Sequence, residues 1–316
     1  MIDIMKLCRA VFLLFCLMIP GFIMKKAKLA DDKTPLAFSN TVLYITQPAL
    51  LFVGFFRRYD KDIMSGAIAV FIFTFVVHAI FLIAVRFFFR KAPKETAKVY
   101  RFGSVFANAG YMGIPLITMI FGAEAAIYAS VYVIGFNFFC WSLGCLIYSE
   151  DKSFISPRKM FLNAATIPTI LGIIVFVTDL YSYIPSAASL FIEDILTMLK
   201  DTVAPMSMMV IGMRLADLKL KGAFKDASLY VALSLRLVIF PVLVFGILLL
   251  CKTFGYYNDV AFSVTLICSA TPAASATCMF AEKFSSDSVT ASKFVSISTI
   301  LSLITMPLVV LLLKLL

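Results

Sequence analysis

The chain has 316 residues, of which 62% are hydrophobic and only 15% are charged, and its mean hydropathy is +0.99. Soluble domains are nearer half apolar and a quarter charged, so this composition excludes a soluble domain and predicts an all-α polytopic membrane protein. A net charge of +10 could suit nucleic acid, but the basic residues lie in short links between apolar runs. We therefore expect a lipid bilayer, and no nucleic acid, as partner.

Cysteine and histidine usage excludes a metal or disulfide framework. The seven cysteines lie in apolar stretches without a CxxC pair, and His78 is the only histidine. We read the cysteines as small packing residues and expect no metal site and no cofactor. Near the N-terminus an apolar run lacks a small-residue cleavage site and is followed by Lys25 and Lys26, so it is read as a first membrane helix.

Ten apolar runs are long enough to cross a bilayer. They cover roughly 5–24, 36–56, 64–86, 100–120, 123–148, 161–179, 188–214, 226–250, 259–280 and 289–313. Pro115 and Pro272 are separated by the same number of residues as Pro48 and Pro205, and this repeated offset divides the ten spans into five and five. The expected units are residues 1–150 and 151–316, together forming one membrane domain. An odd number of spans per unit inverts the second unit relative to the first.

Lys and Arg are concentrated in the links that follow the first, third, fifth, seventh and ninth spans. Positive links stay in the cytoplasm, so we expect a multi-pass protein of the plasma membrane with both termini outside. An even number of spans also requires both termini on one side.

Pro115 and Pro272 lie inside apolar spans, and Pro48 and Pro205 have the same spacing. A proline inside a membrane helix frees backbone groups, and interruptions at matching places in two repeats point to a transporter's binding site. We expect Pro115 and Pro272 each to occupy the first position of a new half-helix, with Thr271 as an N-cap.

Such half-helix starts carry free N–H groups and partial positive charge, so two of them meeting at mid-depth would bind an anion. Asn108 precedes Gly110 and Gly113 and could orient a carboxylate. The alternative is a pair of proline kinks satisfied by hydroxyls or water, without a ligand.

The fourth-span stretch Asn108-x-x-x-Met112-Gly113-Ile114-Pro115-Leu116 resembles the motif of the auxin efflux carrier family, which includes plant auxin exporters and bacterial organic-acid carriers. Gln47-Pro48-Ala49-Leu50-Leu51 and Ala270-Thr271-Pro272 resemble further family segments. The resemblance covers essentially the whole chain.

The resemblance implies ten helices in two inverted five-helix repeats, with broken helices 4 and 9 crossing beside the substrate. It implies a scaffold of helices 1, 2, 6 and 7, a mobile transport part from helices 3–5 and 8–10, elevator-like alternating access, and a homodimer formed through the scaffold. Asn108 would contact the substrate carboxylate. The substrate-binding candidates are Gln47, Asn108, Gly110, Tyr111, Gly113, Pro115, Thr271, Pro272 and Ala273.

The chain departs from the family pattern at three places. It has no long loop between the repeats, it has Ala273-Ala274 where plant members have Gln-Gly, and it has Asn163-Ala164 where many bacterial members have Asn-Pro. These differences favour a small organic anion over auxin as cargo.

Four ionisable residues within spans are candidates for Na⁺ or H⁺ coupling: Lys200, Asp201, His78 and Arg236. Adjacent residues diverge on a helix, so we expect Lys200 and Asp201 not to pair, with Lys200 facing substrate or Glu193. The alternatives are a wet vestibule around Lys200 and Asp201, a packing role for His78, and an Arg236 that caps carbonyls or pairs with an acid.

The leading function is a secondary carrier for a small carboxylate. A membrane enzyme would need a nucleophile and base or metal ligands, and the sequence has neither HExxH nor GxSxG. A channel for an organic anion would have polar pore rings, and a sensor would carry an output module.

Overall fold

The computed structural model describes residues 4–315 except 152, 154, 156, 157, 159–161 and 219–225. Seven helical segments in this part are long and apolar enough to cross a membrane. They span Cys8–Lys26, Thr34–Val53, Lys61–Val85, Ala126–Ser149, Ser186–Ala216, Ala227–Thr253 and Ser288–Leu315. Three apolar helices are shorter, at Ala109–Phe121, Thr166–Val177 and Asp259–Ala270. The chain is therefore an all-helical polytopic membrane protein.

The first half of the chain contains the helices α1 to α9. They are α1 (Ile4–Cys16), α2 (Met18–Lys26), α3 (Thr34–Thr41), η1 (Val42–Thr46), α4 (Gln47–Val53), α5 (Lys61–Val85), α6 (Lys94–Val105), η2 (Ala109–Gly113), α7 (Ile114–Phe121), η3 (Ala123–Ala125), α8 (Ala126–Phe139), η4 (Cys140–Gly144) and α9 (Cys145–Ser149). The fourth apolar segment begins at Lys94, earlier than its apolar run suggested, because polar residues form the first turns of α6.

The second half contains the helices α11 to α18. They are α11 (Thr166–Val177), η6 (Leu180–Tyr183), α12 (Ser186–Asp201), α13 (Val203–Ala216), α14 (Ala227–Ser234), η8 (Leu235–Ile239), α15 (Phe240–Thr253), α16 (Asp259–Ala270), α17 (Ala276–Lys283), α18 (Ser288–Leu311) and η9 (Leu312–Leu315). The helix α11 is shorter than the run at 161–179, and residue 161 lies outside the described part.

Short polar side chains start several of these helices. The carboxylate of Asp60 accepts the backbone N–H groups of Asp62 and Ile63 at the start of α5. Asn258 caps α16 and Asp287 caps α18 in the same way. Each cap satisfies N–H groups that have no partner within the helix, and so defines where the helix begins.

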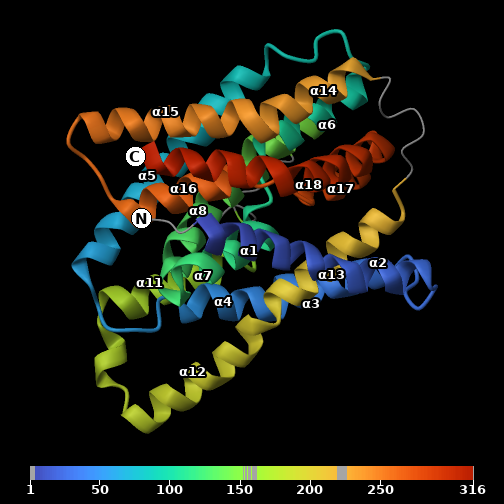
Figure 1. Ribbon diagram of the computed structural model, residues 1–316. Helices are drawn as coiled ribbons and strands as arrows, with labels where there is room; N and C mark the ends of the chain where they lie inside the picture. The colour runs from blue at the N-terminus through green and yellow to red at the C-terminus, as the bar shows by residue number, and fades with distance from the viewer. Residues whose placement is uncertain are drawn as a thin grey trace.

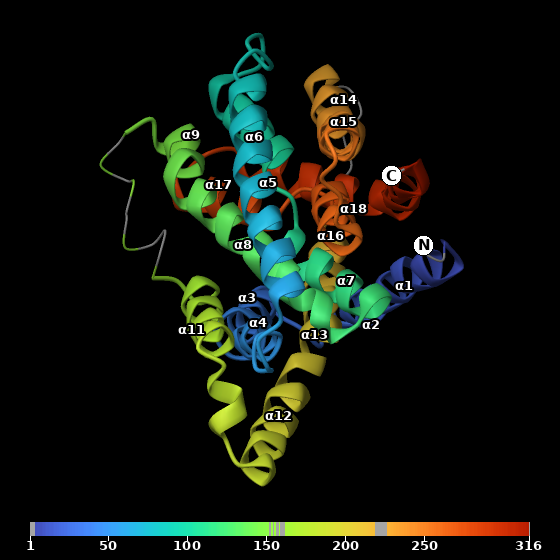
Figure 2. The same ribbon diagram turned by 90° about the vertical axis from the view of Figure 1, so that its left-hand side faces the viewer.

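The helices pack in two groups (Figure 1). Helices α2, α3 and α4 pack with α11, α12 and α13, while α5, α6, α8 and α14 to α18 pack with one another. Helix α1 contacts both groups, α2 and α13 in the first and α18 in the second. Seen from the side, α11 and α12 form the two arms of a V whose tip points away from the remaining helices (Figure 2).

The tightest packing in the first group joins α2 to α13. A Cβ atom on Gly21 would overlap the carbonyl oxygen of Met209, and one on Gly212 would overlap that of Met18. Small residues let membrane helices approach closely, and here the two backbones touch.

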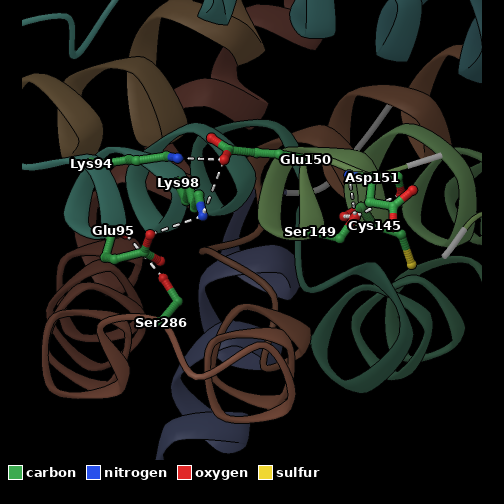
Figure 3. A network of polar contacts seen from close by, with 8 residues as sticks. All are labelled: Lys94, Glu95, Lys98, Cys145, Ser149, Glu150, Asp151 and Ser286. Atoms are coloured by element: carbon green, nitrogen blue, oxygen red, sulfur yellow. Dashed lines mark hydrogen bonds and ion pairs between the residues drawn. The ribbon is translucent and has the colours of Figure 1, made fainter. Parts of the chain in front are cut away.

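The ends of α6 and α9 are joined by ion pairs (Figure 3). Glu150 lies 2.5 Å from the Nζ atom of Lys94, and Lys98 pairs with Glu95 at 2.9 Å. The hydroxyl of Ser286 donates to the carbonyl oxygen of Glu95 and adds the link between α17 and α18. This network connects the start of α6, the end of α9 and the link between α17 and α18.

Candidate functional site

Two helical segments are interrupted, and their interruptions contact each other. Helix α6 ends at Val105, and the chain is extended at Phe106 before η2 begins at Ala109. Helix α16 ends at Ala270, and α17 begins at Ala276. Ala107 and Ala273 form an isolated antiparallel bridge between the two breaks.

Two backbone hydrogen bonds hold this bridge. The N–H of Asn108 donates to the carbonyl of Pro272 at 2.8 Å, and the N–H of Ala274 donates to the carbonyl of Phe106 at 2.9 Å. The breaks therefore satisfy part of each other's backbone, which a lipid environment cannot do.

The residues expected to start the new half-helices do not start them. Pro115 lies within α7, which continues η2, and Asn108 occupies the N-cap position instead. Thr271 is the C-cap of α16, and its hydroxyl donates to the carbonyl of Cys268 at 2.8 Å. The N-cap of α17 is Ser275. Pro272 lies inside its break, whereas Pro115 lies beyond its own break. The two prolines therefore do not occupy equivalent positions in the two interrupted segments.

Polar atoms without partners gather at the starts of η2 and α17. The side chain of Asn108 is 4% exposed, and its Nδ2 atom has no hydrogen-bond partner among the described residues. The same holds for the Oγ atom of Ser275, at 8% exposure. Buried polar groups are normally hydrogen-bonded, so these atoms indicate room for a ligand or water.

Gln47 and Gly110 lie beside Asn108. The Nε2 atom of Gln47 is 3.1 Å from the place where a Cβ atom on Gly110 would lie. Gln47 is buried at the start of α4 and brings an amide from the other helix group to the break. The absence of a side chain at Gly110 permits this approach.

Other candidate residues have packing contacts. A Cβ atom added to Gly113 would lie 3.4 Å from the Sγ atom of Cys268 and 3.5 Å from the Cγ2 atom of Thr271, and Pro115 is buried. The N–H of Ala273 donates to the hydroxyl of Ser298 on α18 at 3.2 Å. These residues bring the interrupted segments together, whereas Gln47, Asn108 and Gly110 form the polar surface.

Arg214 also lies in this region, although it is not among the site residues predicted from the sequence. It lies in the last turn of α13, where its guanidinium interacts with the thiol of Cys278 in α17 and lies near Tyr111 of η2. Its Nε atom is buried without a partner among the described residues. An arginine at a span end reads as interfacial in sequence, so no pattern signalled this position.

The four ion-coupling candidates fall on three helices, with His78 in α5, Arg236 in η8, and Lys200 and Asp201 in α12. His78 is 1% exposed, its Nδ1 atom is 2.8 Å from the carbonyl oxygen of Thr74, and its ring stacks on Phe139. Arg236 is fully buried and donates to backbone carbonyls, one of the two alternatives considered for it. In the described part of the chain no three His, Cys, Asp or Glu residues cluster as metal ligands.

The expectation that Lys200 and Asp201 do not pair is wrong. Their side chains lie 3.7 Å apart, because a long lysine stem can reach around the helix to a neighbouring carboxylate. Asp201 is 69% exposed there. Lys200 lines a cavity of about 590 Å³ together with Glu193. Arg57 and Glu124, which pair at 2.8 Å, line the same cavity.

Interrupted helices that meet around unpartnered donors, inside a polytopic helical protein, are features of membrane transporters. The chain belongs to the membrane transport protein family, whose model matches residues 7–155 and 151–310, and this is the auxin efflux carrier family that its motifs resemble. It is 25% identical over 297 residues to a protein of Methanothermobacter thermautotrophicus described as an uncharacterized transporter. That similarity covers 92% of this chain and 93% of the relative.

Proposed function

We propose that this transporter is a secondary carrier for a small organic anion that bears a carboxylate. The proposal rests on the polar surface at the breaks. Asn108 presents an unpartnered donor, and η2 and α17 begin beside it. Helix starts carry about half a positive elementary charge each. A carboxylate placed there would accept hydrogen bonds that the protein leaves open.

Arg214 supports an anionic rather than a neutral cargo. No ion pair joins it to an acidic side chain among the described residues, and its guanidinium lies near Cys278 of α17 and Tyr111 of η2. A guanidinium binds a carboxylate through two parallel hydrogen bonds, which adds orientation to charge. We propose Asn108, Gln47 and Arg214 as the residues that contact the cargo, with Gly110 and Tyr111 shaping the site.

The transport cycle we propose is elevator-like and uses ten helices in two inverted repeats. In its favour, α2 to α4 pack with α11 to α13 while the interrupted helices lie in the other group. The first group would be the scaffold in a plasma membrane. The apolar residues exposed on α11 and α12, among them Leu171 and Phe191, suit lipid or a scaffold homodimer. Coupling to Na⁺ or H⁺ through Asp201, Lys200 or His78 stays a prediction.

A thermal-shift screen of mono- and dicarboxylates, with and without Na⁺, tests the cargo. We expect a carboxylate to raise the melting temperature of the wild type, and Asn108→Ala to abolish that rise without unfolding the protein. Asn40→Ala is the matched control, because Asn40 is exposed on α3. A ligand-induced rise that survives in Asn108→Ala would remove Asn108 from the site.

Flux measurements distinguish the carrier from its alternatives. In liposomes, a carrier shows saturable counterflow of the carboxylate found in the screen. Flux that does not saturate and exceeds carrier turnover would instead identify a channel, and binding without flux would identify a sensor.

A further inference from the structure

Arg236 lies in the π-helical turn η8, between α14 and α15. Its exposure is 0%. Burying an unpaired guanidinium costs several kcal/mol, so its surroundings must supply compensating negative charge. No ion pair joins Arg236 to an acidic side chain in the described part of the chain.

The compensation comes from two interrupted helices. The Nη1 atom of Arg236 donates to the carbonyls of Ser104 and Val105, at 3.2 and 2.9 Å, and its Nη2 atom donates to the carbonyl of Ser269. Ser104 and Val105 end α6, and Ser269 lies in the last turn of α16.

These carbonyls are those that an interrupted helix leaves without a partner. Each helix C-terminus carries about half a negative elementary charge, so two together match one guanidinium. The same arrangement of converging carbonyl oxygens binds free cations in other transporters.

We infer that Arg236 is a resident cation, a side chain that fills a carbonyl-lined cation site where the first halves of the two interrupted helices end. It holds α6 and α16 at a fixed separation and so positions the breaks beside the cargo site. The inference concerns the architecture of the breaks and is independent of which cargo the carrier moves.

Substitutions that separate charge from volume test this inference. Arg236→Lys keeps a cation that can reach some of the carbonyls, while Arg236→Met keeps an unbranched side chain of similar length without charge. We expect the melting temperature and the folded yield to fall in the order Arg, Lys, Met, with a loss of about 10 °C or more for Met. Arg86→Met, at an exposed position after α5, is the control and should match the wild type. A methionine variant as stable as the lysine variant would overturn the inference, even if both are poorly folded.

Chemical rescue gives a second, independent readout. Arg236→Ala should leave a space that guanidinium can enter, so millimolar guanidinium chloride should raise the melting temperature of this variant and not that of the wild type. Urea has the same planar shape without charge and is the control. Equal effects of urea and guanidinium, or no effect of either, would show that the carbonyls do not form a cation site.

Discussion

The backbone N–H of Asn108 donates to the carbonyl of Pro272 across 164 positions of the chain, at 2.8 Å. This bond places the side chain of Asn108 at the meeting point of the two breaks without using that side chain. The amide group of Asn108 is consequently free for a ligand, while the backbone of the same residue maintains the fold. Substitutions at Asn108 should therefore separate binding from stability.

Arg214→Gln should weaken carboxylate binding about tenfold to a hundredfold, because charge-assisted hydrogen bonds contribute about 1.5–3 kcal/mol. Arg214→Lys should lose less affinity, since it keeps the charge and loses only the two parallel hydrogen bonds of the guanidinium. Titration of the carboxylate that stabilises the wild type measures both effects. The exposed Arg86→Gln is the control. Wild-type affinity in Arg214→Gln would place the anion elsewhere.

Gly212→Ala should destabilise the protein by about 3 kcal/mol or more, because its Cβ atom would overlap the carbonyl oxygen of Met18 and force α2 away from α13. Gly246→Ala is the matched control. It lies in α15 with no atom within 4 Å of the added carbon, and alanine favours helix by up to about 1 kcal/mol. Folded yield and melting temperature report both changes. An unaltered Gly212→Ala protein would contradict the close backbone contact between these helices.

Asp287 should stabilise the protein in a pH-dependent way. Partial burial raises the pKa of its carboxyl group, but hydrogen bonds from Thr290 and Thr96 outweigh this, and the net pKa is lower than usual. A lowered folded-state pKa means that the stabilisation is present above the usual carboxyl pKa and is lost as pH falls through the folded-state value.

Asp287→Ala should accordingly cost about 1 kcal/mol at neutral pH, the usual effect of removing a helix cap. The difference in melting temperature from the wild type should shrink below about pH 4, where carboxyl groups protonate. A scan of both proteins from neutral to acid pH measures this. A difference that stays constant over the whole scan would show that the charge of Asp287 does not contribute.

The membrane class and the presence of interruptions could be predicted from sequence, because hydropathy and helix-breaking residues are local properties. The family could be recognised from Asn108 to Leu116 alone. The exact start of each half-helix could not be predicted from the sequence. Pro115 fits the first turn of a helix, but the helix that contains it already begins at Ala109. Asn108 and Ser275, which flank the paired breaks, take the N-cap positions instead.

Long side chains were the second reason why contacts could not be predicted from the sequence. Arg214 and Lys200 each reach partners that their backbone positions do not suggest, since several rotatable bonds separate the charge from the helix. Arg236 was assigned two alternatives because its partners, the carbonyls of α6 and α16, are distant in sequence and lie together only after folding. Charge placement in a membrane protein therefore depends on tertiary contacts more than on span assignment.

The paired breaks also restrict how this transporter can move. The hydrogen bonds Asn108–Pro272 and Ala274–Phe106 join the two interrupted segments into a single rigid crossing. In a medium without water, separating them would leave four polar groups unsatisfied, at several kcal/mol for each. In the elevator-like cycle proposed above, the two interrupted segments would therefore move past α4 and α13 as one unit, with their mutual hydrogen bonds kept intact.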